Sequence, residues 1–391
     1  MGKQTQINDM EQDGNKELST LVTEEDLERS RTDSVGVIYS YDGKRLLGTE
    51  NIYLHDYVVR DGVKVICDMA FEGSDRLESI TIPNSVKLIG TGAFHGCTRL
   101  ENITLPDSMT NIGEYAFWGC SSLNTFVIPA SVKSIGSGAF NECNIDLTVQ
   151  GDNFIADNGC LIDATKYIML SYFKNQQGIC VVSSIVKEIG REAFCGCDSL
   201  NEIKIHDNVV RIGERAFIDC VSLEQITIPA SVTDIEEGAF EDCSSLSSIT
   251  ILASVKSIKA QTFAKCSSLE HVVIPPSVTD INDSAFFRCT SLEHVVLPVS
   301  LEKIGESSFE QCVLLEHIEI PNSVTSIEER AFFGCTSLRS VKIPKSVTSV
   351  GLLVFFFCTS LEKIVIPDGT REKFDGLFRD NRKLLCEESE L

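Results

Sequence analysis

The sequence has no dense cluster of lysine and arginine, and its overall charge is strongly acidic. Lys and Arg number 34 against 57 Asp and Glu, which gives a formal net charge of −23. A nucleic-acid-binding protein needs clustered basic side chains to replace the counterions of the phosphates, and an anionic membrane surface attracts basic segments for the same reason. The composition therefore argues against nucleic acid and against acidic lipid as partners.

Long apolar runs are also missing. A membrane-spanning helix needs roughly 20 apolar residues, and the most apolar run, residues 352–358, is far shorter. The first residues are polar and acidic, without the apolar core of a secretory signal, and Gln6 stands where a myristoylation motif needs Ser or Thr. We therefore expect no membrane insertion and a cytoplasmic location.

Catalytic and nucleotide-binding motifs are absent as well. The sequence contains no G-x-x-x-x-G-K-[ST] phosphate loop, no H-E-x-x-H zinc motif and no G-x-S-x-G nucleophile elbow. No acid, base or nucleophile forms a constellation outside the repeat described below. We therefore expect no catalytic residues, no cofactor, no small-molecule substrate and no enzyme activity.

What the sequence does contain is a repeat of 23 residues, marked most clearly by phenylalanine. Within two runs, every phenylalanine of the series follows the previous one by 23 positions. The series consists of Phe71, Phe94, Phe117 and Phe140, then Phe194, Phe217, Phe240, Phe263, Phe286, Phe309, Phe332, Phe355 and Phe378. Such self-similarity is typical of repeat architectures, in which each unit stacks on its neighbours.

Each unit, or rung, reads A-F-x-x-C-x-x-L-x-x-I-x-I-P-x-S-V-x-x-I. In the rung of Phe217, the column residues include Cys220, Ile226, Ile228 and Pro229. The L-x-x-I-x-I segment predicts a strand with alternate residues on one face, and Pro ends it because proline cannot donate to a ladder. S-V-x-x-I predicts a second short strand, and A-F-x-x-C a tight helical or 3₁₀ turn. Rungs stacked at about 4.8 Å would bury the apolar columns, so the fold class expected is a β-rich repeat solenoid.

The 16 cysteines follow the same register, since most stand three residues after a rung phenylalanine. Adjacent rungs would place these thiols parallel, which is poor disulfide geometry, and a zinc site needs four converging ligands. The close pair Cys195 and Cys197 is the nearest approach to a metal motif. We interpret the column as a buried, reduced ladder, which is easiest to keep in a reducing compartment, and expect no metal site.

The register breaks between Cys143 and Ser184, where Asn158-Gly159 and the following apolar residues have hairpin chemistry. The segment around Gly36 repeats this pattern, and Gly36 and Gly159 each precede a rung phenylalanine by 35 residues. Six segments are therefore predicted. They are a disordered acidic tail (1–34), an N-terminal hairpin cap (35–66), leucine-rich repeats (67–143), a hairpin insertion (144–185), further leucine-rich repeats (186–370) and a C-terminal cap (371–391).

The segments 343–351 and 331–338 closely resemble the leucine-rich repeats of BspA-like surface proteins of bacteria and of some parasitic protists. The resemblance covers about residues 35–385. It implies a right-handed leucine-rich-repeat superhelix with a role in adhesion or protein binding, and no catalytic residues. It also offers a cell-surface location as the alternative to the cytoplasm.

Three of the 6 histidines fall in one column, eight residues after the rung phenylalanine, and each follows a glutamate. Strand alternation should turn this column outward, with neighbouring imidazoles about 5 Å apart. Three interpretations stay open: one repeat copied without function, a protein-binding face, and a metal bridged by pairs of rings. The candidate binding residues are His271, Val273, His294, Val296, His317 and Glu319.

The leading functional hypothesis is a non-catalytic scaffold for a protein partner whose identity the sequence does not reveal. The alternative within the same class is a cell-surface adhesin that binds host or matrix proteins. A glycan-binding module would need several aromatic side chains on the strand face, and the sequence places almost none there.

Overall fold

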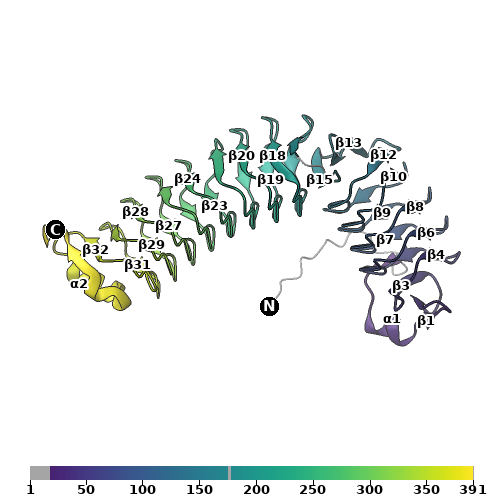
Figure 1. Cartoon of the computed structure of the whole chain (residues 1–391), viewed down its shortest axis with the longest axis horizontal. Helices are drawn as coiled ribbons and strands as arrows, with labels where there is room; N and C mark the ends of the chain where they lie inside the picture. The colour runs from purple at the N-terminus through teal and green to yellow at the C-terminus, as the bar shows by residue number, and fades with distance from the viewer. Residues whose placement is uncertain (1–17, 175–177, 391) are drawn as a thin grey trace. The chain divides into compact units, whose positions relative to one another are not determined.

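The computed structural model describes residues 18–174 and 178–390, which fold as two solenoid units that divide between Asn153 and Phe154. Figure 1 shows the construction common to both: short parallel strands follow one another rung by rung, with few helices. The β-solenoid with inserted hairpins that the repeat predicts is therefore confirmed.

The first unit contains three sheets and one short helix. The helix is α1 (Glu24–Glu28). One sheet runs β1 (Arg31–Thr32), β2 (Val37–Tyr39), β3 (Arg45–Thr49), β5 (Val65–Ile66), β7 (Leu88–Ile89), β9 (Asn111–Ile112) and β11 (Ser134–Ile135). The others are β4 (Asp56–Val58), β6 (Ser79–Thr81) and β8 (Asn102–Thr104), and β10 (Thr125–Ile128) with β12 (Asp146–Val149). β2 and β3 form the expected antiparallel hairpin, and β3 then pairs in parallel with β5.

The prediction of a disordered tail over residues 1–34 is wrong for the part that the structure describes. Thr23 caps α1 in a capping box with Asp26, whose carboxylate lies 2.7 Å from Arg45 on β3. Leu18 and Val22 pack against the buried core of the hairpin. Polar contacts hold much of the segment, since β1 pairs with β2 and Asp33 accepts a hydrogen bond from Tyr57 and lies 3.7 Å from Arg60. Such contacts leave no apolar pattern in the sequence. Residues 1–17 lie outside the described residues.

The second unit also contains three sheets. The first runs β13 (Phe154–Asp157), β14 (Cys160–Asp163), β15 (Ile168–Tyr172), β17 (Glu188–Ile189), β19 (Arg211–Ile212) and β21 (Asp234–Ile235). The second runs β23 (Ser257–Ile258), β25 (Asp280–Ile281), β27 (Lys303–Ile304), β29 (Ser326–Ile327) and β31 (Ser349–Val350). The third runs β16 (Gly178–Val181), β18 (Leu200–Lys204), β20 (Gln225–Ile228), β22 (Ser248–Ile251), β24 (His271–Val273), β26 (His294–Val296), β28 (His317–Glu319), β30 (Ser340–Lys342), β32 (Lys363–Ile366) and β33 (Leu385–Glu387).

The hairpin at the start of the second unit is larger than the sequence indicates. β14 and β15 form the expected antiparallel pair, and β13 adds a third antiparallel strand through the Asn158-Gly159 turn. Both turn residues have positive φ, 51° and 80°, as a tight two-residue hairpin requires. β15 then pairs in parallel with β17, so the hairpin leads directly into the solenoid.

The expected helical or 3₁₀ turn around the rung phenylalanine is a series of tight turns. In the rung of Phe263, Cys266 N–H donates to the Phe263 carbonyl at 3.2 Å, and Phe263 N–H donates to the next rung at 2.8 Å. In all twelve rungs from Phe71 to Phe355, the residues two before and two after the phenylalanine have positive φ. Glycine fits such positions without strain, as Gly238 does (φ 62°), but most of these positions hold other residues.

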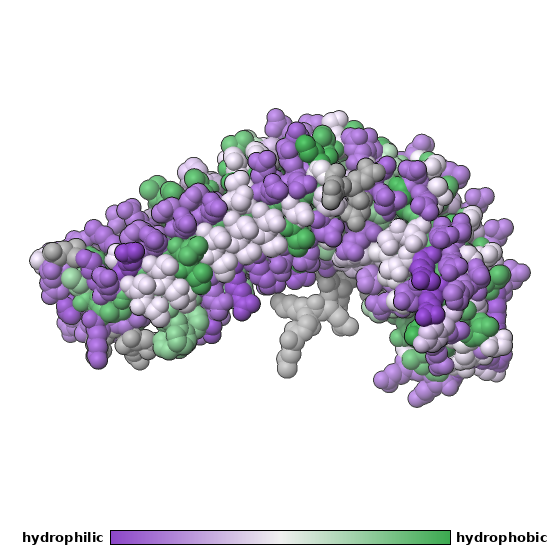
Figure 2. All heavy atoms as spheres, in the orientation of Figure 1, coloured by the Kyte–Doolittle hydropathy of each residue, from purple (hydrophilic) through white to green (hydrophobic). Residues whose placement is uncertain are grey.

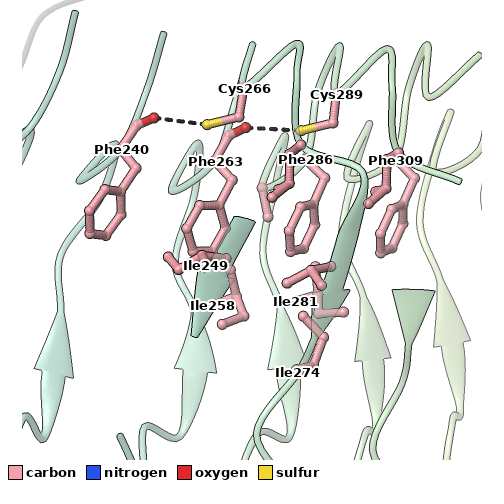
Figure 3. Close-up of a cluster of buried hydrophobic side chains, with 14 of the residues drawn as sticks. Phe240, Ile249, Ile258, Phe263, Cys266, Ile274, Ile281, Phe286, Cys289 and Phe309 are labelled. Carbon is pink, nitrogen blue, oxygen red and sulfur yellow. Dashed lines mark hydrogen bonds between the residues drawn. The ribbon is translucent and has the colours of Figure 1, made fainter. Parts of the chain in front are cut away.

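The core of each unit is a column of phenylalanine rings beside columns of aliphatic side chains and thiols. Figure 3 shows a part of this core in the second unit, from Phe240 to Phe309. Consecutive rings stack at 4.9 to 5.8 Å between centroids. The C-terminal segment continues this stack, because Phe378 follows α2 (Arg371–Leu377) and packs on Phe355. Two 3₁₀ turns, Arg379–Leu384 and Glu388–Glu390, flank β33.

Candidate binding surface

The three-histidine column lies on the outer face of β24, β26 and β28, as strand alternation predicts. In β24, His271 and Val273 are exposed while Val272 between them is buried, and β28 repeats this alternation. Alternate side chains of a strand point to opposite faces, so the inner residue fills the core and the outer two face solvent. We call His271, Val273, His294, Val296, His317 and Glu319 the ladder surface.

Parallel pairing holds the histidines in register. His271 is the Cα partner of His294, and His294 is the partner of His317. The rings of His271 and His294 stack with their centroids 5.5 Å apart and their planes inclined by 14°. The structure therefore brings the three predicted histidines together in one row.

The ring nitrogens of the three ladder histidines form no hydrogen bond or ion pair with any residue that the structure describes. The other histidines differ in this respect. His206 Nε2 lies 2.6 Å from the carbonyl oxygen of Ser183, and His55 and His95 each lie 3.4 Å from a glutamate carboxylate of a neighbouring rung. The ladder imidazoles are consequently free to contact an external ligand.

The second column of the ladder surface is apolar over two strands and charged on the third. Val273 is 66% exposed and Val296 59% exposed, and they are direct cross-strand partners. Glu319 occupies the same column on β28 and faces Lys342 on β30. Lys342 also lies 2.7 Å from Glu388, whose hydrogen bond and charge raise the pKa of Lys342.

A depression continues the same strand face toward the start of the second unit. It has a volume of about 350 Å³ and lies over β18, β20 and β22, with Glu202, Gln225 and Thr250 among its lining residues. Ser248 at its border pairs with His271. Figure 2 shows that hydrophilic side chains cover much of the face in view, with hydrophobic ones gathered between them. The ladder surface and the depression together offer a continuous outer face of mixed character.

The thiol column has a structural role. Ten column thiols each donate to the carbonyl of the phenylalanine 26 residues earlier, with Sγ–O distances of 3.1 to 3.2 Å. Figure 3 shows two of these bonds, from Cys266 to Phe240 and from Cys289 to Phe263. Burial raises the pKa of nine of these ten thiols, that of Cys143 to about 12, whereas a hydrogen bond with Cys335 lowers the pKa of Cys358. All 16 cysteines are free, and 15 of them are buried.

The close cysteine pair is buried, and the ligand-type side chains of the described residues do not cluster. Cys195 and Cys197 are both 5% exposed, and burial of this kind makes a thiol unreactive. Over residues 18–174 and 178–390, no group of three or more His, Cys, Asp or Glu side chains is arranged to hold a metal ion. The outer strand face is suited to contact, through imidazole, aliphatic and carboxylate groups.

Sequence reasoning overlooked one further apolar patch, at the turn of the Phe355 rung. Leu352, Phe356 and Phe357 are 64%, 41% and 59% exposed, and the last two rings contact each other at 4.4 Å. The sequence signal for this patch is the apolar run of residues 352–358, which is too short to span a membrane. Most other rungs place polar or small residues at these variable turn positions.

The pattern of the BspA type leucine rich repeat region, in six copies, matches residues 50–158, 167–293 and 256–385. The chain belongs to the BspA-type leucine-rich-repeat family. Leucine-rich-repeat proteins of this kind commonly act as protein-interaction scaffolds. Over the residues that the structure describes, no helix combines the length and apolar character needed to cross a membrane.

Solved structures of similar proteins show the same fold. A leucine-rich repeat protein from Bacteroides ovatus is 24% identical, with a TM-score of 0.59 over 95% of this chain and 91% of its own. One from Eubacterium ventriosum is also 24% identical, with a TM-score of 0.62 over 84% of this chain and 94% of its own. A leucine rich cell surface protein from Faecalibacterium prausnitzii is 27% identical, with a TM-score of 0.53 over 89% of this chain and 97% of its own. No curated protein matches the sequence.

Proposed function

We propose that this BspA-type repeat protein is a non-catalytic scaffold that binds a protein partner through the ladder surface. The observation that carries the proposal is the in-register row of exposed His271 and His294 beside exposed Val273 and Val296. Large apolar side chains grouped on a surface and bordered by polar ones are typical of protein-binding sites. With a net charge of −23, the chain favours a partner that is neutral or basic around its contact area.

The buried free thiols favour a reducing compartment, and we therefore propose that the protein acts in the cytoplasm. Fifteen buried free thiols line the two units without a disulfide among the residues described. Free thiols persist where glutathione and thioredoxin keep cysteine reduced. The buried thiol–carbonyl bonds also depend on the reduced form, because a disulfide has no proton to donate.

The proposal is tested by capturing partners from lysed source cells on the immobilised full-length chain. We expect one or more proteins to be retained by the wild type and retained much less when His271, His294 and His317 are all replaced by Ala. The double change Val273→Asp and Val296→Asp should have the same effect. Ser349→Asp, which alters an exposed residue on β31 in a different sheet, serves as the matched control. If the ladder variants capture the same proteins as strongly as the control, the binding site lies elsewhere.

A cell-surface adhesin is the second candidate, because the similar Faecalibacterium prausnitzii structure is that of a cell surface protein. Protease treatment of intact source cells separates the two. Loss of the intact chain before lysis would favour the adhesin and contradict the cytoplasmic location. Digestion only after lysis would support the intracellular scaffold.

A further inference from the structure

The ladder histidines combine three properties that suit metal binding. They lie on adjacent parallel strands in register, their rings are exposed, and their nitrogens have no partner among the described residues. Neutral imidazole is a preferred ligand of Zn²⁺, Ni²⁺ and Cu²⁺. Histidines that serve only as surface residues need not share a column, whereas here one column contains three in succession.

We propose that the ladder binds one divalent late-first-row metal ion between the imidazoles of two adjacent strands, with water completing the coordination. The ring centroids of His271 and His294 are 5.5 Å apart. A metal ion sits about 2.0–2.1 Å from each imidazole nitrogen, so the two nitrogens must turn toward each other until they lie on the order of 4 Å apart or less. Exposed side chains on neighbouring strands can make this rotation without moving the backbone.

The geometry limits the ladder to one ion at a time. His294 belongs to both possible pairs, one with His271 and one with His317. No group of three or more ligating side chains in the described part of the chain is arranged around a single point, so the site uses two protein ligands and remains open to water. His294 is therefore required for either metal-binding pair.

The charges around the ladder favour a cation. Glu270, Glu293 and Glu316 immediately precede the three histidines and are exposed. Glu319 lies on the same strand as His317, and its register partner in the next rung, Lys342, is already paired with Glu388. Arg339, which precedes the register partner of His317, is a second basic residue of that rung, so acidic side chains still outnumber basic ones around the ladder. An acidic surrounding raises the local concentration of divalent cations.

The site is tested by calorimetric titration of the full-length chain with ZnCl₂ or NiCl₂ and no partner protein, so that the outcome is independent of the scaffold proposal. The parent protein for these titrations has the substitution Cys386→Ser, because Cys386 is the one cysteine that is not buried. Every histidine variant is made in this parent. We expect one ion per chain. His294→Ala should abolish the binding, while His271→Ala and His317→Ala each leave one pair and should lower the association constant only about twofold.

Matched controls separate the ladder from other groups. His206→Ala should bind like the parent, because His206 is already engaged with Ser183, and MgCl₂ should give no heat because Mg²⁺ prefers oxygen ligands. Binding should also weaken at acid pH, because protons compete with the metal ion for its ligand nitrogens. The proposal is overturned if the parent binds no ion, or if affinity is unchanged when His294 or all three histidines are replaced. Melting curves of each variant confirm that it remains folded.

Discussion

At the scale of single residues, the stacked phenylalanines make each rung depend on the next. Phe263 is fully buried, and its ring stacks between those of Phe240 and Phe286 at 5.6 and 5.3 Å. Its carbonyl accepts from Cys266 N–H within the turn and from the Cys289 thiol of the following rung. Burial of such a side chain stabilises by roughly 1.5–3 kcal/mol, and each aromatic pair adds about 0.5–1.5 kcal/mol.

Replacing Phe263 by Ala should therefore lower the free energy of unfolding by roughly 3–5 kcal/mol. The cost combines lost burial, two lost ring contacts and a cavity that the neighbouring rings cannot close. Chemical denaturation of the variant measures it, with Phe287→Ala as a control because Phe287 is only partly buried. Equal losses for the two variants would show that the phenylalanine column contributes no more than a surface ring.

The thiols give a second prediction at this scale. Burial raises the pKa of the Cys97 and Cys143 thiols to about 12, so almost no thiolate forms at neutral pH. Iodoacetamide applied to the native chain should therefore modify Cys386 and leave the column thiols intact, and denaturant should make all 16 cysteines reactive. Mass spectrometry distinguishes the two patterns. Native-state labelling of Cys97 at the rate of Cys386 would mean that the column is accessible.

At the scale of elements, charged side chains on and beside β17, β19, β21 and β23 link neighbouring rungs of the second unit. Arg211 on β19 lies 3.2 Å from Glu188 on β17 and 2.6 Å from Glu236, and Lys259 lies 2.7 Å from Glu236. Burial alone would raise the pKa of Glu236, but hydrogen bonds from Lys259 and Arg211 outweigh it and lower the pKa to about 2. The network thus connects four consecutive rungs on one edge of the solenoid.

This lowered pKa predicts an acid dependence of stability. A carboxyl that titrates near 4.5 when unfolded and near 2 when folded stabilises the chain above pH 4.5, and this contribution is lost as the pH falls toward 2. Glu236→Gln should lower the melting temperature at pH 7 and show a smaller further decrease between pH 4.5 and 2. Glu237→Gln is the control, because Glu237 is exposed and makes no ion pair with the described residues. Parallel pH curves for wild type and Glu236→Gln would contradict the account.

Element positions follow from the 23-residue period, whereas turn geometry does not. The strand of His271–Val273 and its buried Val272 can be read from the alternation alone, because one face must be apolar. The left-handed positions cannot be read so easily, because Gln261 and Lys265 occupy them as readily as glycine does elsewhere. Stacking on neighbouring rungs outweighs the local cost of this backbone conformation. The preferences of single residues therefore do not predict these positions.

At the scale of the whole molecule, both units share one plan of an antiparallel hairpin followed by parallel rungs. The spacing from Gly36 and Gly159 to the first phenylalanine of each series reveals this plan in the sequence. The N-terminal segment over residues 18–34 escapes prediction, because its contacts through Leu18, Val22 and Arg45 have no period. The exposure of the ladder surface is predictable, but what it binds depends on a partner that the chain does not encode.

The most direct test of the ladder surface as a binding site is site-specific photocrosslinking in source cells. A photoreactive amino acid placed at Val296, which is 59% exposed beside His294, should give a discrete adduct with one or a few proteins. The same amino acid at Ser349 on β31 should give none of these adducts. Adducts at Ser349 with the same proteins, or no adduct at Val296, would contradict the assignment of the ladder surface as the site of partner binding.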